Sequence, residues 1–174
     1  KWRGSNKLGF QITRVRDQLL ESAKVHIKSD VTTIGIYSLN DLKEAWSNGV
    51  RFSFVYFWLI DESKFVDLNE SCFCQWFPSD FIDEKGVKYC CCEQYMMAQK
   101  AMMFKDEITL RKIMDCNDPH VIKKLGREVK NFVPNKWDAN SQEIVYHANL
   151  LKFSQNENLK RFMLSFPRST IFVE

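Results

Sequence analysis

The sequence predicts an α+β fold that is rich in helices, has a small β component and forms a single domain over residues 1–174. Three observations lead to this prediction. A chain of 174 residues is long enough for one sizeable core. Apolar residues recur at helical spacing in several segments, whereas only short stretches have a strand-like composition. No linker, repeat or low-complexity segment divides the chain.

The first fifty residues are expected to combine two helices with a short strand. Residues 6–24 place apolar side chains at i, i+4, i+7 and i+11, the spacing of an amphipathic helix. This stripe consists of Leu8, Ile12, Val15 and Leu19. Residues 25–37 are rich in β-branched side chains and are expected to include a strand. Ser38 is suited to cap a second helix, which has Asp41 in its first turn and ends before Gly49.

The strongest strand signal is “RFSFVYFWLI” at residues 51–60. Its nearly continuous apolar character predicts a buried position, because alternation is lost when both faces of a strand are covered. Pro78 in “CFCQWFPSDF” then indicates an edge or a turn, and Gly86 marks a hairpin.

Helices dominate the prediction from Glu93 onward. Asp118 and Pro119 form an N-cap and first-residue pair for one helix. Asp138 is expected to cap another helix. The buried stripe of that helix consists of Ile144, Ala148 and Leu151. A short helix that ends before Pro167 and a strand in “STIFVE” complete the chain.

Charge and hydropathy limit the classes of function. The net charge of +3 is too small to predict a nucleic-acid partner by itself. No apolar run approaches the roughly 18 residues of a membrane span, and the first residues, “KWRGSNKLGF”, contain no apolar leader segment. A cytoplasmic location without a membrane partner is therefore expected.

The six cysteines do not follow a metal-binding or disulfide pattern. There is no Cys-x-x-Cys pair, and neighbouring cysteines such as Cys90 and Cys91 point to opposite faces if they lie on a strand. The three histidines lack zinc-ligand spacing. The cysteines are expected to be small apolar fillers in a reducing compartment, with no metal and no cofactor.

One helix carries a conspicuous pair of charges in “EQYMMAQKA”. Glu93 and Lys100 are seven residues apart, which places them on one helix face about 10 Å apart. They are too far apart to pair with each other but are suited to flank one ligand, with methionines as adaptable apolar filling. The alternative is that this face is only the solvated edge of a core helix.

Further candidates lie outside that helix. Lys123 and Arg127 share a helix face and are suited to clamp a phosphate or carboxylate, or are simply an exposed basic face. Trp76 and Trp137 are suited to stack on a base or sugar, or are core aromatics. His147 is interpreted as a packing or surface histidine rather than a catalytic one.

Five segments, taken in order, resemble the NADAR (YbiA-like) family over roughly residues 50–174. They are “SCFCQWFPSDF”, “KYCCCEQYMMAQKAMMF”, “KKLGREVKNF”, “KWDANSQEIV” and “LLKFSQNENL”. “STIFVE” resembles the start of the family's closing motif. The chain departs from the family pattern at Gln94, where a histidine is usual, and at Cys74, where a serine is common.

A larger departure concerns the order of the segments. The family's last helix usually carries Trp-x-Gly-x-Asn-x-Leu-Gly followed by Val-Arg-Asp, and residues 1–24 resemble it. The matching residues are Trp2, Gly4, Asn6, Leu8, Gly9, Val15, Arg16 and Asp17. The chain therefore resembles a circularly permuted member, or one assembled from neighbouring domains, and it lacks the family's Trp-Gly-x-Gly segment.

The resemblance implies an N-glycosidase, a hydrolase that cleaves the C–N bond between a ribose phosphate or ADP-ribose and a nucleobase-like group, free or attached to nucleic acid. It implies that Glu93 and Lys100 are catalytic. It implies a set of substrate-binding residues: Trp76, Gln99, Arg127, Trp137, Asp138 and Glu174. The alternatives are a non-catalytic ADP-ribose or nucleotide-binding module, and an interaction domain without a ligand.

Overall fold

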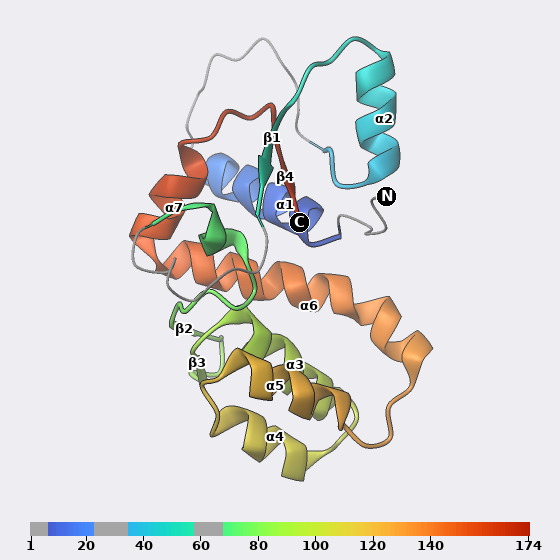
Figure 1. Cartoon of the computed structure of the whole chain (residues 1–174), viewed down its shortest axis with the longest axis vertical. Helices are drawn as coiled ribbons and strands as arrows, with labels where there is room; N and C mark the ends of the chain where they lie inside the picture. Colours follow the sequence, from blue (N-terminus) through green and yellow to red (C-terminus); the bar gives the residue numbers. More distant parts are fainter. Residues whose placement is uncertain (1–6, 23–34, 58–67) are drawn as a thin grey trace. The chain divides into compact units, whose positions relative to one another are not determined.

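A computed structural model describes residues 7–22, 35–57 and 68–174 of the chain (Figure 1). The described residues form two compact units. The first unit comprises the described residues up to Cys74 together with Glu157–Glu174, and the second comprises Gln75–Asn156. The helix-rich α+β class is confirmed, because helices predominate and the strands are few and short.

The first unit contains helices around a small parallel β-pair. Its elements are α1 (Lys7–Ser22), α2 (Leu39–Ser47), β1 (Ser53–Tyr56), the 3₁₀ helix η2 (Glu70–Phe73), α7 (Glu157–Leu164) and β4 (Thr170–Val173). Strand β1 pairs in parallel with β4, with Ser53 opposite Thr170. Helix α1 packs beside β4, and all four residues of its predicted stripe are buried. The cap at Ser38 is confirmed, since its Oγ accepts a hydrogen bond from the Asp41 amide at 3.1 Å.

The buried side chain of Arg16 connects α1 to the segment that leads into β4. Arg16 donates to the carbonyl oxygens of Pro167 at 3.1 Å and Thr170 at 2.6 Å. The same guanidinium holds the Asp17 carboxylate at 2.8 Å. Burial raises the pKa of Asp17, although the neighbouring Arg16 opposes the shift. The Asp17 carboxylate and the two carbonyl oxygens compensate the buried charge of Arg16.

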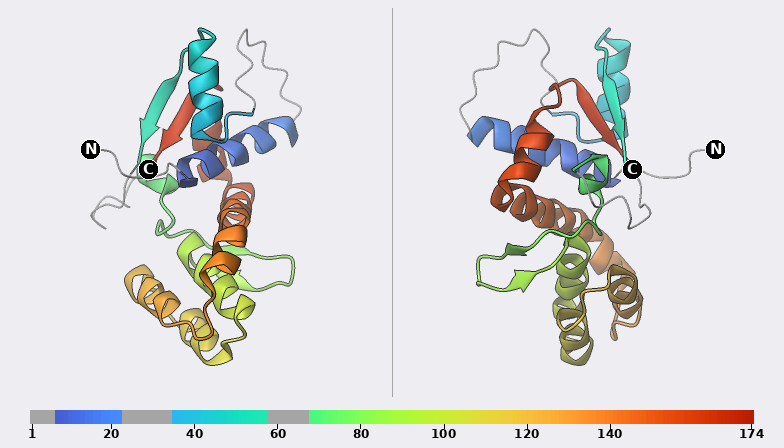
Figure 2. Two further views of the ribbon diagram at one scale, coloured as in Figure 1. Left: turned by 90° about the vertical axis from the view of Figure 1, so that its right-hand side faces the viewer. Right: turned by 60° about the vertical axis from the view of Figure 1, so that its left-hand side comes forward.

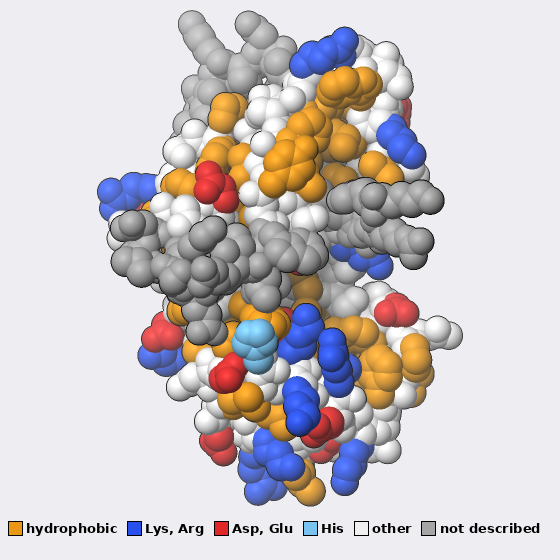
Figure 3. Space-filling view, in the orientation of Figure 1, with side chains coloured by type: hydrophobic (Ala, Val, Ile, Leu, Met, Phe, Trp, Pro, Cys, Tyr) orange, Lys and Arg blue, Asp and Glu red, His pale blue; other side chains and the backbone are white. Residues whose placement is uncertain are grey.

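The predicted burial of the “RFSFVYFWLI” strand is wrong for Phe54 and Tyr56 of strand β1, whereas Phe57, which follows the strand, is buried. Phe54 is 39% exposed and Tyr56 is 71% exposed, and Figure 3 shows hydrophobic side chains on the surface of this unit. The reason is that, in the part of the chain that is described, β1 pairs only with β4, and a two-stranded pair is too narrow to be covered on both faces. Most of the strand expected at residues 25–37, and residues 58–60, lie outside the described residues.

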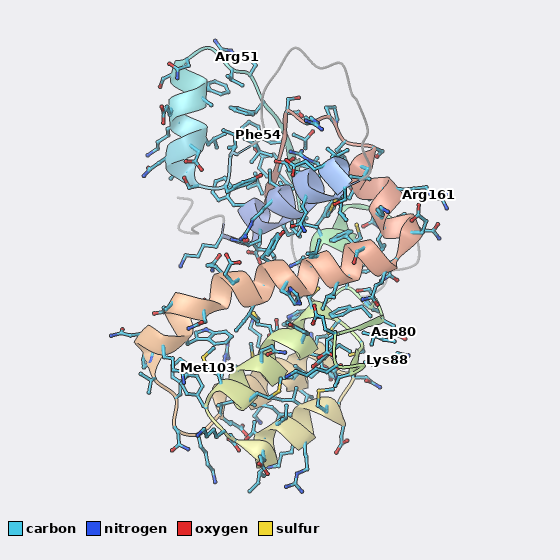
Figure 4. All side chains as sticks on the ribbon, turned by 180° about the vertical axis from the view of Figure 1, so that it is seen from behind. Arg51, Phe54, Asp80, Lys88, Met103 and Arg161 are labelled. Atoms are coloured by element: carbon cyan, nitrogen blue, oxygen red, sulfur yellow. The ribbon has the colours of Figure 1, made fainter. Side chains whose placement is uncertain are left out.

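The second unit is built around a central helix. Its elements are β2 (Phe81–Ile82), β3 (Lys88–Tyr89), α3 (Cys92–Met103), α4 (Glu107–Met114), α5 (Pro119–Arg127) and α6 (Pro134–Gln155). Helix α3 packs against α4, α5 and α6 (Figures 1 and 2). The hairpin at Gly86 is confirmed, and the Asp80–Lys88 ion pair of 2.6 Å lies across it (Figure 4).

Two other boundary predictions have different outcomes. The N-cap at Asp118 is confirmed, because its carboxylate accepts hydrogen bonds from the amides of His120 and Val121. The predicted cap at Asp138 is wrong. Helix α6 already begins at Pro134, whose ring holds the backbone torsion that a first helical residue needs, so Asp138 lies inside the helix.

Gln94, the residue that replaces the expected histidine, joins α3 to the end of α4. Its Oε1 accepts from the Cys90 amide at 2.8 Å. Its Nε2 donates to the carbonyl oxygens of Ile113 at 3.1 Å and Cys116 at 2.8 Å. Both ends of the carboxamide are therefore used in holding the first turn of α3. None of the described helices has the length and apolarity needed to cross a membrane.

Asp106 provides a test of the pH dependence of stability. It caps α4, accepting from the Thr109 amide at 3.1 Å and the Lys130 amide at 2.9 Å. These hydrogen bonds lower the pKa of Asp106 to about 2. The folded pKa is below the ordinary value of about 4, so the unfolded chain takes up the proton first as the pH falls. The stability contributed by Asp106 is therefore complete above pH of about 4 and lost between about 4 and about 2.

Thermal unfolding should show this loss directly. The melting temperature of the parent chain should fall more steeply between these pH values than that of Asp106→Asn. The control is Asp115→Asn, which removes an exposed carboxylate at the other end of α4 and should leave the slope unchanged. Equal slopes for the parent chain and Asp106→Asn would contradict the assignment.

Candidate active site

Helix α3 places Glu93 in the interior rather than at a solvated edge. Glu93 is the second residue of the helix and its side chain is 3% exposed. Its backbone amide donates to the carbonyl oxygen of Gln75 at 3.0 Å, which links the helix start to the preceding segment. The solvated-edge alternative is therefore wrong for Glu93. A buried carboxylate costs free energy unless it is hydrogen-bonded, paired or used in a reaction.

Lys100 lies two turns further along the same face, next to two aromatic side chains. Its Nζ donates to the carbonyl oxygen of Gly126 at 2.7 Å. The same Nζ is 4.2 Å from the ring centroid of Phe132 and 5.5 Å from that of Trp137. Burial lowers the pKa of Lys100 below that of an ordinary lysine. Among the predicted site residues, Lys100 and Trp137 are thus brought together.

The close approach of α5 makes the Gly126 carbonyl available to Lys100. A Cβ atom at Gly126 would lie 1.9 Å from Sδ and 2.8 Å from Cγ of Met97. Met97 is one turn after Glu93 on the same face of α3, and it is buried. Only a glycine permits the backbone of α5 to lie this close to α3. Because Gly126 has no side chain, α5 lies close enough to α3 for its carbonyl oxygen to reach Lys100.

Gly126→Ala is expected to destabilise the fold by about 1–3 kcal/mol, because overpacking outweighs the gain in helix propensity. Urea unfolding measures this free energy. Adding Met97→Ala removes the clashing sulfur, so the double variant should be less destabilised than the sum of the two single variants. Additive effects would show that the two residues do not compete for one space.

A second cluster forms around Trp76. Its ring centroid is 4.3 Å from that of His120, in an edge-on arrangement, and Lys123 Nζ is 5.1 Å from the Trp76 ring. Arg127 is exposed at the end of the same helix, α5. Lys and Arg side chains gather on the surface of this unit (Figure 3). The basic face expected for Lys123 and Arg127 is thus present and exposed.

The remaining predicted residues lie elsewhere. Gln99 lines a cavity of about 630 Å³ between α3 and α6, on a different side of α3 from Lys100. The other residues that line this cavity include Tyr95, Met102, Asn140, Glu143, Tyr146 and His147. Asp138 is exposed on α6, and Glu174 is exposed at the chain end in the first unit. His147 pairs with Glu84 at 2.7 Å, which agrees with its interpretation as a surface histidine.

The structure adds a residue that sequence reasoning did not select. Gln75 is 7% exposed, and its Nε2 donates to Asn149 Oδ1 at 3.2 Å. Asn149 in turn donates to the carbonyl oxygen of Val145 at 2.8 Å, which fixes the direction of both amides. Gln75 Oε1 is buried and has no hydrogen-bond partner among the described residues. A fixed, unsatisfied acceptor beside the start of α3 is suited to receive a donor from a ligand.

A buried lysine was also missed. Lys152 on α6 is fully buried, with its Nζ 5.3 Å from the ring centroid of Phe77 and 5.2 Å from that of Phe153. Both residues stand in segments that were noted for their resemblance, Gln75 before Trp76 and Lys152 in “LLKFSQN”. Both side chains are polar, and the neighbouring sequence gave no reason to expect them to be buried. Their burial depends on how distant segments pack in the folded domain.

The fold and this site define a helix-rich α+β domain with an acid and an amine on one helix face. The sequence model of the NADAR domain matches residues 56–174. The chain belongs to the NADAR domain family.

Two curated proteins are similar to the chain in sequence. The chain is 45% identical over 103 residues to N-glycosidase R617 of Acanthamoeba polyphaga mimivirus, covering 57% of this chain and 61% of the relative. It is 34% identical over 82 residues to Protein irg-1 of Caenorhabditis elegans, covering 46% of this chain and 39% of the relative. The matches thus span less than two thirds of the length of each relative.

The fold is similar to that of a solved structure. The NMR structure of the E. coli protein YbiA superposes with a TM-score of 0.51 at 21% sequence identity. The superposition covers 64% of this chain and 60% of YbiA. At this level of identity the likeness concerns the fold alone.

Proposed function

We propose that this domain is an N-glycosidase that hydrolyses the C–N bond between a ribose phosphate or ADP-ribose and a nucleobase-like group. The observation that carries the proposal is that one face of α3 holds both a buried carboxylate, Glu93, and a partly desolvated amine, Lys100, two turns apart. The similarity to a relative named as an N-glycosidase supports the same reaction class.

Glu93 is proposed to stabilise the transition state. Cleavage of a C–N glycosidic bond develops positive charge at the anomeric carbon, and a nearby carboxylate stabilises that charge. A buried carboxylate is also suited to activate the attacking water. Its backbone link to Gln75 holds the first turn of α3 while the charge develops.

Lys100 is proposed to act on the sugar. A partly buried lysine with a lowered pKa has more free amine at neutral pH, and a free amine attacks an opened sugar to form a Schiff base. The Gly126 carbonyl and the rings of Phe132 and Trp137 hold its Nζ in position. The alternative role is a fixed positive charge that binds a phosphate.

The substrate-binding roles follow the chemistry of the surrounding side chains. Trp76 and Trp137 are proposed to form walls against the base or ribose, and Arg127 to contact a phosphate. Gln75 Oε1 is proposed to accept a hydrogen bond from the substrate. Gln99, Asp138 and Glu174 remain proposed substrate contacts.

The order of segments is proposed to be permuted relative to the family, or assembled from neighbouring domains. The hydrogen bonds of Arg16 on α1 to Pro167 and to Thr170, the first residue of β4, support this proposal. Trp2, which should lie near Glu174, is outside the described residues. Spin labels at positions 2 and 174 measure this separation, and chain ends at opposite poles would contradict the permuted arrangement.

One observation favours the alternative of a non-catalytic ADP-ribose or nucleotide-binding module. Gln94 replaces the family's usual histidine, and its carboxamide is used in structural hydrogen bonds. A carboxamide cannot exchange a proton as an imidazole does near neutral pH.

Release of a free base separates the two functions. The protein is incubated with a phosphoribosylamino-pyrimidine and, separately, with nucleic acid that carries ADP-ribosylated guanine. If chromatography detects a base released from either compound, the N-glycosidase function is supported. Saturable binding without release supports the module, whereas neither binding nor release supports an interaction domain.

A further inference from the structure

Two neighbouring thiols lie together immediately before α3. The sulfur atoms of Cys90 and Cys91 are 3.9 Å apart, so the expectation that these side chains point to opposite faces is wrong. Cys91 is the N-cap residue of α3 and is buried, whereas Cys90 is half-buried and is reached more easily from solvent. The pair is therefore a dithiol with one accessible member.

The surroundings of the pair bring one more thiol into the same region. The Gln94 carboxamide accepts from the Cys90 amide and donates to the Cys116 carbonyl, each at 2.8 Å. The Cys116 sulfur, however, is directed to the carbonyl oxygen of Asp118 at 3.6 Å. Cys91 is thus the thiol in direct contact with Cys90, and Cys116 is the competing partner that an experiment has to separate.

The two thiols differ in acidity. The hydrogen bond with Cys91 lowers the pKa of Cys90, although burial and the nearby Asp80 and Cys116 oppose the shift. The same hydrogen bond and burial raise the pKa of Cys91, and Glu93 adds to this increase. Cys90 therefore ionises first, and the thiolate is the form of cysteine that reacts.

We propose that Cys90 and Cys91 are a thiol-modification site at which a hydroperoxide forms a disulfide between the two neighbouring residues. The Cys90 thiolate attacks the peroxide, so that an S–O bond forms, the O–O bond breaks and water or an alcohol leaves. The Cys91 sulfur then attacks the resulting sulfenic acid, forming the S–S bond and releasing water. The dithiol loses two electrons and two protons, and the hydroperoxide is reduced.

Closing this disulfide must move the start of α3. The sulfur–sulfur distance has to shorten from 3.9 Å to about 2.05 Å, within a ring that contains the peptide bond between the two residues. Cys91 is the N-cap, and Glu93 follows two residues later. Oxidation is therefore expected to displace the first turn of α3 and, because this part of the inference rests on the proposed function, to reduce the reaction rate reversibly.

The test treats the full chain with one equivalent of hydrogen peroxide and maps the products by peptide mass spectrometry. The expected product has lost two hydrogen masses and contains a Cys90–Cys91 link that dithiothreitol reverses. Cys90→Ser and Cys91→Ala should each abolish this product, and the matched control Cys116→Ser should retain it. A Cys90–Cys116 link, or stable sulfinic acid on Cys90 in the parent chain, would overturn the proposal.

A second measurement does not depend on catalysis. Amide hydrogen exchange in the first turn of α3 should become faster by on the order of tenfold after oxidation and recover after reduction. The disulfide can form even if the protein has no glycosidase activity, so failure of the proposed function leaves both measurements interpretable. Unchanged exchange in a fully oxidised sample would contradict the displacement of α3.

Discussion

Glu93→Gln is expected to lower kcat by about a hundredfold or more while changing KM little, because it removes charge stabilisation that is needed only in the transition state. The substitution keeps the size of a side chain that is 3% exposed, so it removes the charge without opening a cavity. Glu93→Ala should lose at least as much rate. Steady-state kinetics on the substrate that releases a base measures both parameters.

The matched control for Glu93→Gln is Glu107→Gln, which removes an exposed carboxylate from the first turn of α4. This control should retain the parent rate. A melting temperature near that of the parent chain is needed to show that Glu93→Gln is folded. A folded Glu93→Gln variant with full activity would remove Glu93 from the mechanism and leave its burial as a structural feature.

Lys100→Arg is expected to lose about a hundredfold or more in kcat if the amine reacts with the sugar. Arginine keeps the positive charge but does not form an imine at neutral pH. Borohydride should trap an adduct between the parent protein and the substrate, and this adduct should be absent from Lys100→Ala. Intact-protein mass spectrometry detects the adduct and peptide mapping assigns it to a residue.

The pH dependence gives an independent check on Lys100. Because burial lowers the pKa of Lys100, the rising limb of the rate profile should lie at lower pH than that of an ordinary lysine. The matched control is Lys124→Arg, an exposed lysine on α5 that should remain fully active. If Lys100→Arg is fully active and no adduct is trapped, the lysine serves only as a charge.

The helix that carries the site was predictable from spacing, but the residues that surround Lys100 were not. Glu93 and Lys100 are seven residues apart on a segment with clear helical character, and α3 contains both. The partners of Lys100 come from Gly126 and from two rings more than thirty residues away in sequence. Their position depends on the close approach of α5 to α3, which no local pattern encodes.

Local signals failed where tertiary context decided the outcome. Asp138 has the chemistry of a cap, but Pro134 starts α6 earlier. The apolar run at residues 51–60 predicted burial, yet the exposure of Tyr56 follows from how few strands pair around it. Cys90 and Cys91 were expected to diverge because they were treated as strand residues, whereas the chain turns into α3 at that point.

The pairing of β1 with β4 has a consequence for how the chain is made. Ser53 and Thr170 are hydrogen-bonded through their side chains although they are 117 positions apart. During synthesis the ribosome must therefore add all the residues between them before β1 meets its partner. The continuous unit Gln75–Asn156 emerges in one piece and is expected to fold first. Until β4 emerges, the exposed edge of β1 is a site where nascent chains are expected to associate with one another or with chaperones.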